Sequence, residues 1–191
     1  MGTRNLIEVY NQDGLKVSQY GQWDGYPEGQ GKHILNFLHS IDILEFNKKL
    51  DNCKFLIYKD LELLDEQRIP VPHHRSRDRG AEILEIINNN EEEILELKSS
   101  HSFGFNSLFC EFAYVIDICK NTFEIYEGFN HNKLEITERF YSLYNENMNP
   151  EKFDTEYFGV KLIKTYYLNN LPDEETFLKE LNEILDNKEN E

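Results

Sequence analysis

The chain has 191 residues and a formal net charge of −16, with 39% hydrophobic and 13% aromatic residues. This length and apolar content predict one globular domain over residues 1–187, followed by a frayed acidic tail at 188–191, and they exclude a disordered chain. Nucleic-acid phosphates and anionic membranes repel so acidic a chain, and no apolar run is long enough to span a bilayer. Neither nucleic acid nor membrane is therefore expected as a direct partner.

The first elements predicted are a hairpin and one or two helices. Residues 4–10 and 15–22 are rich in β-forming residues, and the turn signal Asp13-Gly14 lies between them. After the glycine-rich stretch 21–31, apolar residues recur at helical spacing through about residue 50. The short run 55–58 fits a strand and the start of another helix equally well.

The middle of the chain is predicted to hold a loop, a helix and a second hairpin. Two prolines and a glycine break regular structure at 68–80. Residues 81–98 have helical spacing, with a polar run at 88–90 that can divide the helix. Residues 110–119 and 122–126 are β-rich arms, and their short connection predicts a hairpin.

The last third is predicted to contain a helix, a strand and a final helix. Residues 134–144 favour a helix, 160–168 are β-rich, and an apolar helical stripe follows Pro172. The complete order predicts an α+β fold, with an antiparallel sheet built from the two hairpins plus the late strand and with helices packed on it. The pattern leaves open whether the two hairpins share one sheet.

The cysteines and the N-terminus favour a cytoplasmic protein. Cys53, Cys110 and Cys119 are too far apart for a C-x-x-C pair, and residues 1–6 lack the apolar core of a signal peptide. We expect reduced thiols and no cofactor. No metal site is expected either, because the six histidines show no ligand spacing typical of one.

The stretch 21–31, GQWDGYPEGQG, is the most distinctive part of the chain, because it holds four of the ten glycines and the only tryptophan. In one interpretation it is a ligand or partner site: Trp23 and Tyr26 form an aromatic wall, Asp24 and Glu28 bind a polar group, and glycine amides face an anion. In the other it is a structural corner that packs Trp23 over the sheet. The glycine spacing matches no known phosphate loop.

Together, the opening MGTRNL, the segment QYGQWDGYPEGQG and the later CEFAYVIDICKNTFEIYEGF resemble a group of proteins from phages, bacteria and fungi. The resemblance covers residues 1–31 and 110–129. It implies no biochemical activity by itself. A phage setting, which would place the chain in the host cytoplasm, favours an inhibitor of host machinery.

The N-terminus also resembles the start of the N-terminal-nucleophile hydrolases of the proteasome type, over about 25 residues. In that family, cleavage after Gly2 would free Thr3, whose amine would act as general base for its own hydroxyl. Lys16 and Lys32 are the available counterparts of the family's catalytic lysine. The alternative is that Thr3 simply begins the first strand.

Four of the six arginines lie within the loop 68–80: Arg68, Arg75, Arg77 and Arg79. In so acidic a chain they form an isolated cationic island. Guanidinium groups suit phosphate or carboxylate, so the loop can bind a nucleotide, an acidic partner surface or a second subunit. The alternative is a surface loop that offsets the local acidity.

The leading hypothesis from the sequence is an acidic, phage-type binding protein that engages and inhibits a basic host protein, such as a nucleic-acid-binding defence component. The alternative is a nucleotide-like ligand binder or a hydrolase, including the Thr3 amidohydrolase. In the general enzyme or ligand-binder alternative, the 21–31 loop and the arginine loop line one pocket, where Asp24 serves as acid or base and Arg75 or Arg77 binds an anion. The sequence also leaves open a homo-oligomer.

Overall fold

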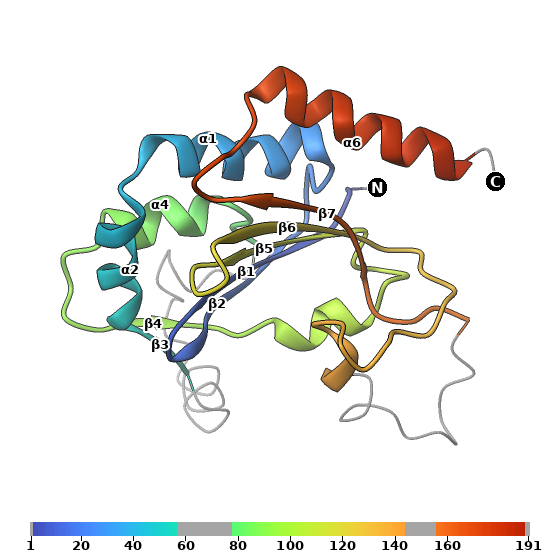
Figure 1. Ribbon diagram of the computed structural model, residues 1–191. Coiled ribbons are helices and arrows are strands. Elements are labelled where there is room, and N and C mark those ends of the chain that lie inside the picture. The colour runs from blue at the N-terminus through green and yellow to red at the C-terminus, as the bar shows by residue number, and fades with distance from the viewer. Residues whose placement is uncertain (1, 57–77, 144–155, 190–191) are drawn as a thin grey trace.

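The computed structural model describes residues 2–56, 78–143 and 156–189. A five-stranded sheet lies at the centre, with helices stacked over one face and irregular segments under the other (Figure 1). The strands are β1 (Asn5–Asn11), β2 (Gly14–Gly21), β5 (Phe112–Asp117), β6 (Thr122–Glu127) and β7 (Lys161–Tyr167), in the order β2-β1-β5-β6-β7.

The two predicted hairpins and the late strand are confirmed, and they share this one sheet. β1 pairs with β2, β5 with β6 and β6 with β7, all antiparallel. The prediction of a purely antiparallel sheet is wrong at one place, because β1 and β5 run parallel. Parallel neighbours need a long crossover connection, and here it is the segment from the end of β2 to the start of β5.

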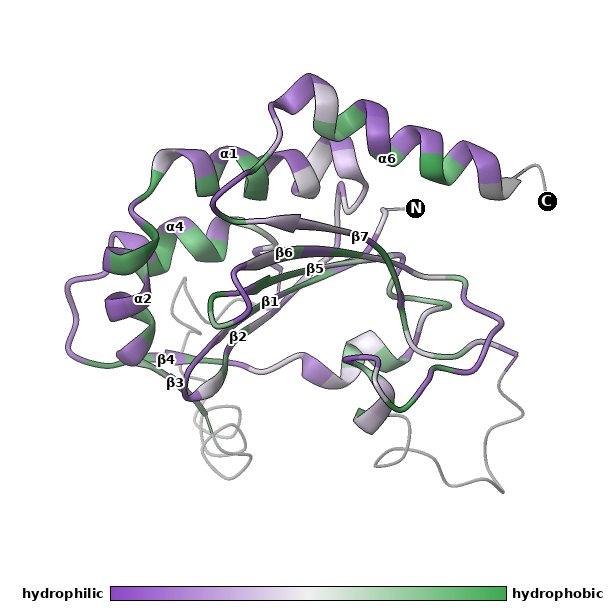
Figure 2. Ribbon diagram, viewed as in Figure 1, coloured by the Kyte–Doolittle hydropathy of each residue, from purple (hydrophilic) through white to green (hydrophobic). Residues whose placement is uncertain are grey.

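The helices α1 (Lys32–Ser40), α2 (Ile43–Asp51), α4 (Glu82–Asn88) and α6 (Glu174–Glu189) cover one face of the sheet. Two helices, not one, follow the glycine-rich stretch, because Asp42 starts α2 by accepting hydrogen bonds from the amides of Leu44 and Glu45. Figure 2 shows that the helices turn apolar residues toward the sheet.

The core on this face is built from alternate strand residues. Ile7, Tyr114, Ile116 and Phe123 are fully buried beneath the helices. The Phe123 ring stacks on that of Phe177 in α6, with the ring centroids 6.0 Å apart. α6 is therefore fastened to the sheet by its aromatic anchor as well as by its apolar stripe.

A second, two-stranded sheet corrects the prediction for residues 81–98. The helix ends at Asn88, and β4 (Leu95–Leu97) pairs in parallel with β3 (Cys53–Phe55). Residue 55 therefore lies in a strand. The spacing of the apolar residues in 94–97 is compatible with a helix. These residues are extended because their backbone N–H and C=O groups pair with a strand that lies 42 positions earlier in the sequence.

The opposite face of the large sheet is covered by the 3₁₀ segment η3 (His101–Phe105) and by residues 134–143. The prediction of a helix over 134–144 is largely wrong. Residues 136–140 form turns, and only 141–143 are helical before the described part ends. Phe140 from this segment is fully buried against Tyr126, with ring centroids 5.1 Å apart. Among the described residues, no helix is both long and apolar enough to cross a bilayer.

Substitution of Phe177 tests the anchoring of α6. Phe177→Ala should lower the free energy of unfolding by about 3–5 kcal/mol, because it leaves a cavity beside Phe123 in a closely packed core. Urea unfolding measures the change. Leu44→Ala, at a side chain that is 68% exposed, is the control and should change stability by less than ~0.5 kcal/mol. Equal losses in both variants would contradict this packing.

Candidate functional site

One end of the sheet gathers the segments of interest. Strand pairing places Gly21, Asn5, Phe112, Glu127 and Lys161 in one row across all five strands. The glycine-rich loop that follows β2, the loop that precedes β5 and the loop that follows β6 all start from this row. They are therefore neighbours at the same end, the right-hand end in Figure 1.

The backbone of the 21–31 loop is held by the body of the protein. The buried hydroxyl of Tyr114 donates to the carbonyl of Gly25 at 2.8 Å, and the Gly25 amide donates to the carbonyl of Thr3 at 2.9 Å. The Asn5 side-chain amide donates to the carbonyls of Gly21 and Trp23. Each contact joins the loop to the sheet or to the strand entering it, so the loop has one fixed shape.

Close approach explains the glycines. A Cβ at Gly29 would lie 2.1 Å from the Asp24 carbonyl oxygen, and one at Gly31 would lie 3.1 Å from the Tyr114 ring. The amides of Gly25, Gly29 and Gly31 donate to carbonyls of Thr3 and Tyr26, not outward. The loop therefore is a tight corner, and its amides do not form the anion site considered from the sequence.

The aromatic and acidic side chains of the same loop are exposed. Trp23 is 58% exposed and Tyr26 is 41% exposed, so Trp23 does not pack over the sheet as the corner interpretation expected. The Tyr26 hydroxyl donates to Asp24 at 3.2 Å, and the charge of Asp24 raises the pKa of Tyr26. Glu28 is also exposed. The structure thus combines a rigid backbone with displayed aromatic and acidic side chains.

Only the end of the arginine loop is described. Arg79 forms an ion pair with Glu82 at 2.9 Å, in the first turn of α4. Arg75 and Arg77 lie outside the described residues. Next to Arg79, the Asp78 carboxyl group accepts a hydrogen bond from the backbone amide of Gln22 at 2.6 Å. This bond connects this end of the arginine loop to the 21–31 loop.

The structure separates Thr3 from Lys16, one of the two candidate lysines of the hydrolase interpretation. Thr3 lies just before β1, whereas Lys16 pairs near Val9, at the turn end of the first hairpin. Thr3 lies six residues before Val9 along the chain, which corresponds to roughly 20 Å at about 3.3 Å per strand residue. A lysine side chain is too short to cross this distance. Lys32 starts α1 and its ammonium lies 3.6 Å from the Glu174 carboxyl group in α6.

A buried polar cluster on the second face of the sheet was missed by the sequence analysis. Glu8 is fully buried, and its carboxyl group accepts from the hydroxyls of Ser18 at 2.9 Å and Tyr10 at 2.8 Å. His101 of η3 places Nδ1 2.6 Å from the same carboxyl group. The signal was present in the sequence: the acidic Glu8 stands in the middle of a strand, between the apolar residues Ile7 and Val9.

Arg139 completes this cluster from the segment beneath the sheet. Its guanidinium donates to Asp117 at 2.7 Å and to both carboxyl oxygens of Glu124 at 2.9 Å, and it lies over the Tyr10 ring. Burial alone would raise the pKa values of Asp117 and Glu124. Hydrogen bonds from Arg139 outweigh burial and hold both pKa values below their usual range. The cluster fastens residues 134–143 to the sheet.

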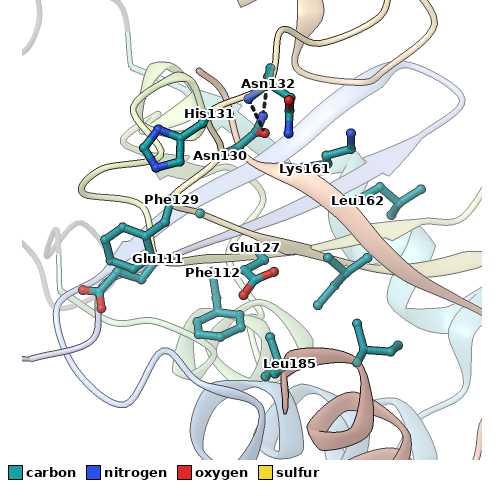
Figure 3. Close-up of a pocket in the computed structure, with 13 residues that line it drawn as sticks. Glu111, Phe112, Glu127, Phe129, Asn130, His131, Asn132, Lys161, Leu162 and Leu185 are labelled. Carbon is teal, nitrogen blue, oxygen red and sulfur yellow. Dashed lines mark hydrogen bonds between the residues drawn. The ribbon is translucent and has the colours of Figure 1, made fainter. Parts of the chain in front are cut away.

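A cavity of about 820 Å³ also opens at the same end of the sheet, between β5, β6, β7 and the second half of α6 (Figure 3). No sequence pattern could reveal it, because its walls come from segments around residues 111, 128, 162 and 184. Its volume lies in the range of small-molecule pockets.

No metal cluster is found in the described ranges, and two of the three thiols, those of Cys53 and Cys110, are buried, whereas Cys119 is exposed. The described ranges contain no group of three or more His, Cys, Asp or Glu side chains that could hold a metal ion. Burial raises the pKa of the Cys53 thiol to about 11 and raises that of Cys110 as well. At neutral pH both thiols are therefore protonated core residues, not nucleophiles.

Comparison with family models, with curated proteins and with solved structures gives no match for this chain. The functional argument therefore depends on the geometry of the sheet end.

The Arg139 cluster predicts acid sensitivity. Because the pKa values of Asp117 and Glu124 are lower in the folded state, their stabilising contribution is complete above their unfolded values of about 4 and is lost as pH falls below them. Glu124→Gln should lower the free energy of unfolding by about 1–3 kcal/mol at pH 7 and flatten its fall between about pH 5 and pH 2. Urea unfolding across pH measures both.

The exposed Glu135 provides the matched control. Glu135→Gln should keep the wild-type pH profile, since this side chain lies at the surface. A Glu124→Gln profile that superimposes on the wild type would contradict the role given to the cluster.

Proposed function

We propose that this is an acidic binding protein that engages a basic protein partner through the sheet end that carries the 21–31 loop. The observation that carries the proposal is the gathering of exposed aromatic side chains at this end. Trp23 and Tyr26 follow β2, Phe109 precedes β5 and Phe129 follows β6, and all four are between 41% and 58% exposed.

Rigid aromatic residues are the usual anchors of a protein interface. They bury a large area on binding and lose few rotatable bonds, so they contribute most when the backbone beneath them is already fixed. The 21–31 loop meets that condition through Tyr114, Asn5 and the close-packed Gly29. A surface without a binding role has no need to keep a tryptophan exposed on so firmly held a loop.

Charge selects the kind of partner. The net charge of −16 favours encounter with a basic protein, and the loop adds Asp24 between its two aromatic residues and Glu28 after them. Carboxylates beside aromatic rings suit the lysine and arginine side chains of such a partner. The resemblance to phage proteins extends the proposal: the partner would be a basic host protein, and occupation of its basic groove would inhibit it.

Replacement of Trp23 tests this surface. Trp23→Ala should reduce the retention of basic partner proteins at least tenfold when the tagged chain is recovered from host cells, because an interface anchor is lost. Quantitative mass spectrometry of the recovered proteins gives the ratio. The free energy of unfolding should fall by no more than about 1 kcal/mol, since the side chain is exposed.

Leu44→Ala is the matched control, since Leu44 is exposed and lies in α2, which contacts the hairpin-turn end of the sheet through Asp51 and Asn11. It should retain every partner. Retention of the same partners by Trp23→Ala would refute the surface. A loss of about 3–5 kcal/mol of stability in that variant would instead restore the purely structural corner.

A further inference from the structure

The cavity at the end of the sheet has apolar walls of mixed origin. Phe112 and Ile163 come from the sheet, Ile184 and Leu185 from α6, and Phe129 from the loop after β6. Walls from two layers and a loop make a concave site, unlike a flat interface patch. Its volume of about 820 Å³ fits a small organic molecule or one long side chain with its surroundings.

Phe129 is held at this cavity against its own backbone preference. Its φ angle is +50°, a left-handed value that a bulky residue adopts only under constraint. Hydrogen bonds from the Phe129 amide to the Ser107 carbonyl and from the Gly128 amide to the Glu111 carbonyl, both 2.8 Å, impose it. A Cβ at Gly128 would lie 2.2 Å from the Cys110 carbonyl oxygen, so the chain must pass close here. The ring is nevertheless 51% exposed.

Two carboxyl groups line the same cavity. Glu127 pairs across the strands with Phe112, so its side chain rises beside that ring, and Figure 3 shows Glu127, Phe112 and Leu185 pointing into the same space. Glu111 is the second. Lys161, exposed at the start of β7, also lines the cavity.

Elsewhere at this end of the sheet, a phenyl ring and a carboxyl group already contact a guanidinium, that of Arg4. The guanidinium of Arg4 lies 4.7 Å from the Phe109 ring centroid, and its Nε lies 3.6 Å from a Glu111 carboxyl oxygen. A positive charge thus sits between a phenyl ring and a carboxylate at the outer side of Glu111. The cavity contains the same kinds of group: the Glu127 carboxyl group lies beside the Phe112 ring, and Phe129 is a further ring in the lining (Figure 3).

We propose that this cavity binds an organic cation: an ammonium or guanidinium group carried on an apolar chain. Glu127 would receive the charge, the rings of Phe112 and Phe129 would flank it, and Ile184 and Leu185 would contact the apolar chain. The same chemistry is found in free aliphatic amines and in the lysine and arginine side chains of a peptide. The cavity shares Phe129 with the proposed partner surface, but Glu127, Phe112 and the α6 residues belong to the cavity alone, and Trp23 and Tyr26 do not line it.

Calorimetric titration with three probes tests the inference. N-butylguanidine is a free alkylguanidinium with a single charge, Nα-acetyl-arginine methylamide presents the same group on a peptide unit, and N-butylurea is the neutral counterpart of similar shape. We expect N-butylguanidine or the capped arginine to bind at least tenfold more tightly than N-butylurea, with affinity that falls as salt rises. Tighter binding of N-butylguanidine identifies a free organic cation as ligand, and tighter binding of the capped arginine identifies a peptide side chain.

Variants locate the site. Glu127→Gln should weaken the cationic probe at least tenfold, whereas Glu92→Gln, at an exposed glutamate outside the cavity, should leave it unchanged. Phe129→Ala provides a second test at an exposed ring and should also weaken binding. Trp23→Ala should leave probe binding intact, so failure of the partner surface and failure of the cavity are distinguishable.

Three results would overturn the inference. The first is that neither cationic probe binds. The second is that N-butylurea binds as tightly as the cations, which would make the cavity an apolar pocket. The third is that Glu127→Gln and Phe129→Ala both bind like the wild type, which would place the cation elsewhere on this acidic surface.

Discussion

The parallel pairing of β1 with β5 is the constraint on which the rest of the structure depends. It joins residues about 107 positions apart, Asn5 with Phe112, and turns two separate hairpins into one sheet. Because β1 and β5 start at the same end, the segments entering them and the segments leaving β2 and β6 must also meet there. The Arg4 carbonyl accepts from the Glu111 and Phe112 amides, which extends this junction to the segment before β1. The exposed aromatics and the cavity therefore share one end of the sheet as a consequence of topology.

The two faces of the sheet differ in the interactions that stabilise them: within the described part of the chain, only the face opposite the helices has a buried cluster of carboxyl groups around a guanidinium. The helical face is an apolar core with stacked rings such as Phe123 and Phe177. The other face buries Glu8, Asp117 and Glu124, whose desolvation would be costly without the hydroxyls and the guanidinium that surround them. Such a cluster adds little net stability over an apolar core, but it requires Arg139 in one position. The cluster thereby holds residues 134–143 in one conformation, although this segment has little helix or strand of its own.

Local signals in the sequence were sufficient for the hairpins, the last helix and the glycine loop. Asp13-Gly14 specifies a turn by its own backbone preferences, and the stripe of α6 depends only on period. Residues 94–97 and 134–144 were misassigned because distant partners decide their conformation: β3 in one case, the sheet and Arg139 in the other. The loop side chains Trp23 and Tyr26 were identified as a candidate site from composition alone. The cavity was not, since its walls come together only after β5, β6, β7 and α6 are assembled.

The two ends of the sheet differ in backbone strain. Three non-glycine residues in the described part of the chain have positive φ: Asp24, Asn121 and Phe129. Asn121 lies in the β5–β6 turn at the opposite end, where asparagine tolerates this conformation and nothing more need be explained. Asp24 and Phe129 lie at the end with the exposed rings, and a phenylalanine has no side-chain group to offset the cost. Aspartate, like asparagine, tolerates a positive φ, so the strain at this end lies at Phe129, whose conformation is imposed by the hydrogen bonds of its own amide and of the Gly128 amide although its ring stays half exposed.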